Sequence, residues 1–158
     1  MIPPDIAAIR NFYPASPRIW TGGQPSAAQL AALAGAGVQA VLNLGLPDAP
    51  YALPEEETRC RTLGMRYLNL PIPFDAPEPA HYAAFEAALR AWEAEGLHSF
   101  VHCAANYRVS ACIALYGRFR WGWSPEAAAA CASRFRVPDA VWARWMQLLE
   151  KSSGTRPE

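Results

Sequence analysis

One short stretch of the chain combines residue types that could carry out nucleophilic chemistry. Cys103 follows the apolar segment 99–101, and Arg108 and Ser110 come soon after it. The pattern predicts a strand, a tight loop and the first turn of a helix. Such a junction directs free backbone N–H groups and the positive end of a helix dipole at one point, where an oxyanion such as phosphate can bind. A cysteine thiolate at that point would be an activated nucleophile.

Arg108 is the only charged residue of this loop, and the energy needed to ionise a thiol explains why a cation is required. A thiol with a pKa of ~8.5 is only a few per cent ionised at neutral pH. A helix dipole contributes about 0.3–2 kcal/mol, which lowers a pKa by at most about 1.5 pH units. Loop amides and a nearby guanidinium must supply the rest. The alternative is purely structural, with Cys103 a small buried residue and Arg108 a surface charge.

The loop resembles the signature of cysteine-dependent tyrosine and dual-specificity phosphatases, His-Cys-x5-Arg-Ser/Thr. His102 and Cys103 match it, Ser110 lies at the family's Ser/Thr distance from the cysteine, and Asn106 replaces the usual glycine. Asn tolerates the left-handed conformation better than most other residues. Four residues instead of five separate the cysteine from Arg108, so either Arg and Val are exchanged or the loop is one residue tighter. The shorter spacing is similar to that of bacterial phosphatase-like domains associated with sulfide metabolism.

The resemblance implies a role for each residue of the loop. Cys103 is the expected nucleophile, Arg108 the expected oxyanion ligand, and His102 a buried residue that orients the loop. The remaining positions are expected to bind the substrate: Ala104, Ala105, Asn106, Tyr107, Val109 and Ser110. The hydroxyl of Ser110 could donate to the sulfur anion or cap the following helix.

Cleavage of a phosphate ester also needs an acid that protonates the leaving oxygen. The family supplies an aspartic acid from a mobile loop about thirty residues before the cysteine. Asp75 lies 28 residues before Cys103, in the proline-dense segment 71–79, and we assign it as general acid and later as general base. Glu78 is the second candidate. Either carboxylate could instead cap the helix that begins near Pro79.

Strand and helix patterns alternate along the rest of the chain, and the resemblance covers roughly residues 14–150. Apolar segments predict strands at residues 18–22, 38–44, 65–70 and 97–101. Helical spacing and capping residues predict helices at residues 26–35, 54–64, 79–95, 109–121, from 124, and 138–149. This alternation predicts an α/β domain with a mostly parallel central sheet of about four strands flanked by helices, as in dual-specificity phosphatases. We expect a single domain over residues 1–158, with residues 1–13 as an N-terminal arm and 152–158 as a disordered tail.

Composition narrows the possible functions. The chain has 158 residues and 52% hydrophobic residues, enough to bury a core in one domain. Its 14 basic and 14 acidic residues cancel, which argues against broad nucleic-acid or membrane binding. Lacking a signal segment or a long apolar run, it is predicted to be cytoplasmic. Cys112 and Cys131 lie in helical patterns and are expected to be buried and reduced, and no metal site or organic cofactor is indicated.

These patterns predict a phosphomonoester hydrolase that acts on a phosphorylated protein, such as one carrying phosphotyrosine, or on a small phosphomonoester through a phosphocysteine intermediate. Two alternatives stay open. In a rhodanese-like sulfurtransferase Cys103 would carry a persulfide, and Asp75 would not be needed. In an oxyanion-binding module the shortened loop would bind phosphate or sulfate without turnover.

Overall fold

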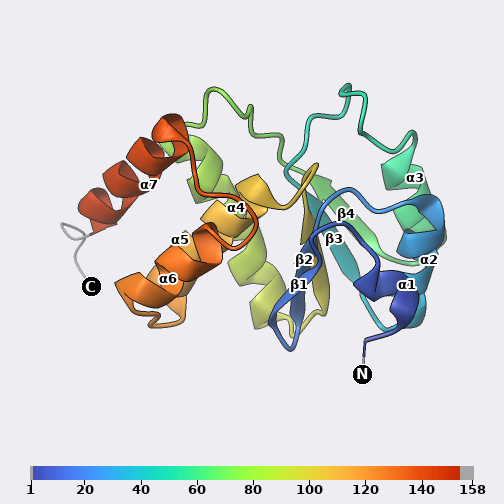
Figure 1. The fold of residues 1–158 in the computed structure, drawn as a ribbon. Helices are drawn as coiled ribbons and strands as arrows, with labels where there is room; N and C mark the ends of the chain where they lie inside the picture. The colour runs from blue at the N-terminus through green and yellow to red at the C-terminus, as the bar shows by residue number, and fades with distance from the viewer. Residues whose placement is uncertain (1, 154–158) are drawn as a thin grey trace.

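A five-stranded sheet forms the centre of the molecule in the computed structural model, which describes residues 2–153 (Figure 1). The strands are β1 (Tyr13–Ser16), β2 (Ile19–Gly22), β3 (Ala40–Asn43), β4 (Arg66–Asn69) and β5 (Ser99–His102). Their order is β1-β2-β5-β3-β4, and all neighbouring pairs are parallel except β1 with β2. The mostly parallel sheet is as predicted, but the expected four strands omit β1. This strand contains Pro14, which cannot donate a ladder hydrogen bond and is tolerated at a sheet edge.

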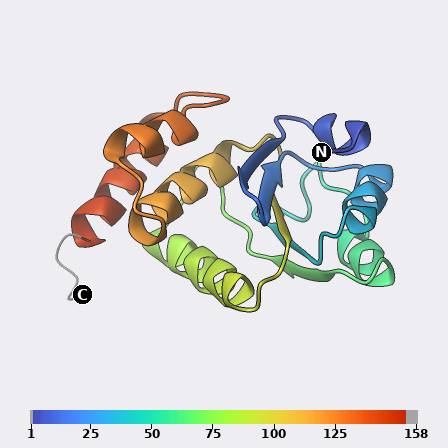
Figure 2. The ribbon, with the colours of Figure 1, turned by 90° about the horizontal axis from the view of Figure 1, so that it is seen from below.

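Helices cover both faces of the sheet, as Figures 1 and 2 show from two directions. One face carries α1 (Pro4–Ala7), α2 (Ala27–Gly35) and α3 (Glu56–Thr62). The other carries α4 (Pro79–Ala94) and α5 (Tyr107–Arg120), and α6 (Pro125–Ala132) and α7 (Ala140–Ser153) pack against α5. Each layer has its own apolar core against the sheet. None of the helices within residues 2–153 has the length and hydropathy needed to span a bilayer.

The central strand β5 is buried on both faces, and its side chains alternate between the two cores. Phe100 packs in the core of α1–α3, whereas Val101 and Cys103 pack in the core of α4–α7. The His102 ring stacks on that of Phe100 with 5.7 Å between ring centroids, so it lies on the α1–α3 side. Consecutive residues therefore send the histidine and the cysteine to opposite faces of the sheet.

The predicted N-terminal arm, residues 1–13, packs against the sheet in its described part. Residues 1–13 include α1, and Ile6 and Ile9 are almost fully buried against the sheet. A capping box begins α2, because Ser26 Oγ accepts from Gln29 N at 3.1 Å and Gln29 Oε1 accepts from Ser26 N at 2.9 Å. At the other end α7 continues to Ser153, and the rest of the predicted tail lies outside the described residues.

Candidate active site

The loop after β5 turns sharply into α5 through a residue in the left-handed conformation. Asn106 has φ 71° and is 1% exposed. Its Nδ2 donates to the carbonyl of Asn11 at 2.7 Å and to Thr21 Oγ1 at 3.1 Å, and its side chain does not cap the helix. The first helical hydrogen bond runs from Ser110 N to Asn106 O. The N–H groups of the preceding turn therefore have neither an intrahelical acceptor nor a side-chain cap, as an anion-binding helix start requires.

The Gly23-Gln24-Pro25 segment after β2 supports this loop from one side. Gln24 N donates to the Ala104 carbonyl at 3.0 Å, and Asn11 Nδ2 donates to the Ala105 carbonyl at 2.8 Å. Gly23 permits this contact, since a Cβ at that position would lie 2.6 Å from the Ala104 oxygen. Two segments far apart in the sequence thus fix the loop backbone.

Arg108 is buried rather than a surface charge. The residue is 5% exposed, and its guanidinium donates to the Ile72 carbonyl at 2.9 Å and to the Tyr51 hydroxyl at 3.1 Å. Tyr51 was not predicted. It lies in the long connection between β3 and α3, where nothing in its spacing marks it as a partner of a residue 57 positions away.

Cys103 and Arg108 line one cavity of about 300 Å³. Its lining residues are Arg10, Phe74, Cys103, Ala104, Ala105, Tyr107, Arg108 and Arg136. Three of the six predicted substrate-binding residues are among them. Of the other three, Asn106 shapes the loop and Val109 is fully buried in the core, so Arg108 and not the residue after it faces the cavity. Ser110 Oγ donates to Asn106 Oδ1 at 3.2 Å, and neither contact proposed for it from the sequence is seen.

The segment carrying Asp75 borders the site, although the carboxylate does not line the cavity. Ile72 binds Arg108 through its carbonyl, and the Phe74 carbonyl accepts from Trp142 Nε1 at 2.6 Å. Asp75 follows directly and is exposed. Glu78 occupies the N-cap position of α4, so the capping alternative applies to Glu78 rather than to Asp75.

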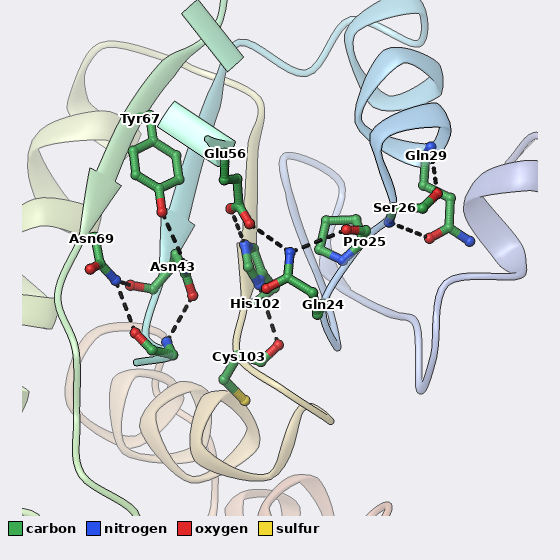
Figure 3. A network of polar contacts seen from close by, with 11 residues as sticks. Gln24, Pro25, Ser26, Gln29, Asn43, Glu56, Tyr67, Asn69, His102 and Cys103 are labelled. Carbon is green, nitrogen blue, oxygen red and sulfur yellow. Dashed lines mark hydrogen bonds and ion pairs between the residues drawn. The ribbon is translucent and has the colours of Figure 1, made fainter. Parts of the chain in front are cut away.

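A buried polar network on the opposite face of the sheet was missed from the sequence (Figure 3). His102 Nε2 lies 2.6 Å from Glu56 Oε2, and Gln24 Nε2 donates to Glu56 Oε1 at 2.6 Å. The other ring nitrogen of His102, Nδ1, lies 3.3 Å from the Cys103 carbonyl. Both ring nitrogens thus face oxygen atoms. His102 and Glu56 are 0% and 5% exposed, so we interpret this as a buried ion pair that fixes the peptide of the cysteine.

No protein-family model matches the chain, and no curated protein matches it. Among solved structures, a protein from Shewanella putrefaciens CN-32 with the provisional description of a DUF442 phosphatase is 28% identical, with a TM-score of 0.84 over 94% of this chain and 96% of that one. TpbA from P. aeruginosa is 22% identical, with a TM-score of 0.71 over 87% and 84%. The core catalytic domain of the PP-IP phosphatase SIW14 from S. cerevisiae is 15% identical, with a TM-score of 0.72 over 92% of both chains.

The fold is that of the tyrosine and dual-specificity phosphatases. This result confirms the expected α/β class and the phosphatase-like fold that the resemblance implied. Cys103 lies at the carboxyl end of the central strand. Among residues 2–153, no group of three or more His, Cys, Asp or Glu side chains could hold a metal ion.

The Glu56→Ala variant of the protein is expected to lose about 3 kcal/mol of unfolding free energy, because it leaves the buried His102 without its partner. Urea unfolding measures the loss. Glu57→Ala is the matched control. Glu57 is exposed and pairs with Arg61 at 2.8 Å on the surface, so its loss should stay below about 1 kcal/mol. Equal losses in both variants would contradict the assignment of a buried ion pair.

The other three cysteines of the chain, Cys60, Cys112 and Cys131, are buried and unpaired, as predicted for Cys112 and Cys131. Burial, together with the charge of Glu56, raises the pKa of Cys60 to about 12, and burial raises the pKa of Cys131 to about 11. Burial likewise raises the pKa of Cys112. At neutral pH these three groups are therefore thiols and poor nucleophiles.

Iodoacetamide at neutral pH is therefore expected to alkylate Cys103 and to leave the other three cysteines unmodified. A thiol with a pKa near 11 is ionised to only about one part in 10⁴ at pH 7. Peptide mass spectrometry of the native protein measures the modification, and the denatured protein provides the control in which all four cysteines react. Equal alkylation of Cys131 and Cys103 in the native protein would contradict the prediction.

Proposed function

We propose that the protein is a cysteine-dependent phosphomonoester hydrolase of the tyrosine-phosphatase type. One observation carries the proposal: Cys103 and the buried Arg108 line the same cavity, beside a helix start whose N–H groups have no side-chain cap. A tetrahedral phosphoryl group can accept hydrogen bonds from the guanidinium and from these N–H groups. The sulfur below it can then attack phosphorus.

The first step transfers the phosphoryl group to the enzyme. Cys103 Sγ attacks as a thiolate, the S–P bond forms, and the bond between phosphorus and the ester oxygen breaks. Arg108 and the N–H groups at the start of α5 stabilise the negative charge on the other oxygens. Asp75 donates its proton to the leaving oxygen, so that an alcohol or phenol departs. The proposal for Asp75 is supported by its neighbour Phe74, which lines the cavity, and by the exposure of Asp75 itself.

The second step releases phosphate and regenerates the thiolate. Asp75, now ionised, removes a proton from a water molecule that attacks phosphorus, and the S–P bond breaks. The ion pair of His102 with Glu56 does not contact the substrate in this mechanism. It holds the Cys103 carbonyl and therefore positions the start of the loop. Arg108 keeps its contacts with Ile72 and Tyr51 and needs no large movement.

The proposed substrates are phosphotyrosine and other phosphomonoesters with an accessible leaving group. The rings of Phe74 and Tyr107 line the cavity and offer apolar surface to an aromatic leaving group. The location in the cytoplasm remains a prediction from the sequence.

The proposal is tested by assaying the purified protein in parallel with 4-nitrophenyl phosphate and with thiosulfate plus cyanide. We expect phosphate release and no thiocyanate, and activity that persists with a chelator present. The Cys103→Ala variant reports any contaminating phosphatase. Formation of thiocyanate without phosphate release would overturn the proposal in favour of sulfur transfer. Thermal stabilisation by phosphate without any turnover would reduce the protein to an anion-binding module.

A further inference from the structure

Two further arginines line the cavity of Cys103, and the proposed mechanism does not use them. Arg10 comes from the N-terminal segment and Arg136 from the connection between α6 and α7. With Arg108 they make three cationic lining residues, and none of the residues found to line this cavity within 2–153 is acidic. Arg108 and the start of α5 suffice for one phosphoryl group. The cavity therefore has more positive charge than one phosphomonoester requires.

Two aromatic rings of the cavity wall hold the guanidinium of Arg136. Its central carbon lies 5.2 Å from the ring centroid of Tyr107 and 5.7 Å from that of Phe74. Such contacts attract a cation to the face of a ring, but they leave its N–H groups without acceptors. The cation is thus positioned at the wall of the cavity rather than paired there.

Arg136 forms no ion pair within the described part of the chain, although it lines one small cavity together with Asp139. Asp139 is the acidic residue nearest to it in sequence, and its Oδ1 accepts from Trp142 N at 3.0 Å at the start of α7. This carboxylate therefore caps a helix, and Arg136 keeps its capacity to bind an anion.

The segment that carries Arg10 is tied to the loop of Cys103. The Arg10 carbonyl accepts from Gly23 N at 2.7 Å, and the next residue, Asn11, donates to the Ala105 carbonyl at 2.8 Å. The N-terminal segment thus forms part of the cavity wall.

We infer that Arg136, assisted by Arg10, forms a subsite for a second anionic group of the substrate. This inference rests on the proposed function, and it narrows the substrates to phosphomonoesters that carry a phosphoryl or carboxylate group near the one that is cleaved. A guanidinium binds both groups through paired N–H donors. Ala104 and Ala105 add no charge within the loop, so the selectivity comes from residues outside it.

The test measures binding in the Cys103→Ser background, where no ligand is consumed. Isothermal titration calorimetry gives the Kd of phenyl phosphate, 3-carboxyphenyl phosphate and 1,3-phenylene bisphosphate. We expect the second anionic group to tighten binding by about tenfold, equivalent to about 1.4 kcal/mol. The preference should shrink as the ionic strength rises, since the subsite is open to solvent. The carboxylate and bisphosphate ligands distinguish the two kinds of second group.

Arg136→Met is the decisive variant, because it keeps an apolar chain against Phe74 and Tyr107 but removes the charge. It should lower the preference for the doubly anionic ligands severalfold. Arg134→Met is the matched control. Arg134 lies in the same connection, but its guanidinium stacks on Tyr13 at 3.7 Å, and it does not line the cavity. The inference is overturned if the second anionic group gives no gain, or if both variants lower the preference equally.

Hydrolysis of phenyl phosphate by the unsubstituted protein is measured separately. Absence of hydrolysis would refute the proposed function, whereas loss of the binding preference would refute only the subsite.

Discussion

Replacing Cys103 by serine is expected to lower the turnover of aryl phosphates by about 10⁴-fold or more, because no other group at the site can form the covalent intermediate. The electrostatic field of Arg108 and the start of α5 can ionise a thiol, but it leaves a serine hydroxyl almost fully protonated. The variant should still bind phosphate, since Arg108 and the start of α5 are unchanged. Steady-state kinetics with 4-nitrophenyl phosphate measures the loss, and calorimetry with phosphate measures the retained binding.

Cys112→Ala is the matched control for this prediction. Cys112 lies in α5, is fully buried, and does not line the cavity, so the variant should retain turnover close to that of the unsubstituted protein. Acid quenching during turnover of a labelled aryl phosphate should trap phosphate on the protein, with the label on the peptide that contains Cys103. Turnover of Cys103→Ser within tenfold of the original value would show that the reaction does not pass through this sulfur.

Regular local patterns made most of the fold predictable. In α4, predicted at residues 79–95, helical periodicity reflects which face is buried, and the apolar residues at this spacing are all buried: Tyr82, Phe85, Leu89 and Trp92. The missed elements, α1 and β1, are four residues long, and each contains a proline. Such short segments owe their structure to packing, as the burial of Ile6 shows, rather than to their own pattern.

The site was predictable where its residues are neighbours in sequence. Cys103 and Arg108 stand five positions apart, and a strand followed by a helix brings them to one cavity. The side chains that bind Arg108 and His102 are distant in sequence. Tyr51 is 57 residues from Arg108, and Glu56 is 46 residues from His102. The sequence has three consecutive glutamates at positions 55–57, and only the packing of α3 against the sheet determines that the middle one is buried.

The buried ion pair and the cavity lie on opposite faces of the sheet, and the backbone of the loop links them at Cys103 and Ala104. His102 belongs to the α1–α3 core side, Cys103 to the other side, and the Cys103 carbonyl faces the imidazole. A change at Glu56 can therefore reach the nucleophile through His102 at the end of β5, or through Gln24, whose N–H donates to the Ala104 carbonyl. This geometry accounts for a positioning role of Glu56 without any contact with the substrate.

Asp75→Asn is expected to lower turnover by about 10²–10⁴-fold for phenyl phosphate, whose leaving group needs a proton, because the amide cannot supply one. For 2,4-dinitrophenyl phosphate, whose leaving group departs as an anion, transfer to the cysteine should slow little. Pre-steady-state release of the phenols measures this first step alone. Glu78→Gln is the control and should not change the dependence on the leaving group, since Glu78 is at the N-cap of α4.

Asp75 does not line the cavity, so it can act as the proton donor only if its carboxylate moves toward Cys103. The backbone on its N-terminal side is held twice, by Arg108 at the Ile72 carbonyl and by Trp142 at the Phe74 carbonyl. Asp75 lies in a turn that the hydrogen bond from Ala76 N to the Pro73 carbonyl closes at 3.2 Å, so we expect the carboxylate to approach the cavity from this turn rather than by movement of the whole loop. An equal loss for both leaving groups would show that Asp75 shapes this turn, and the proton donor would have to be sought elsewhere.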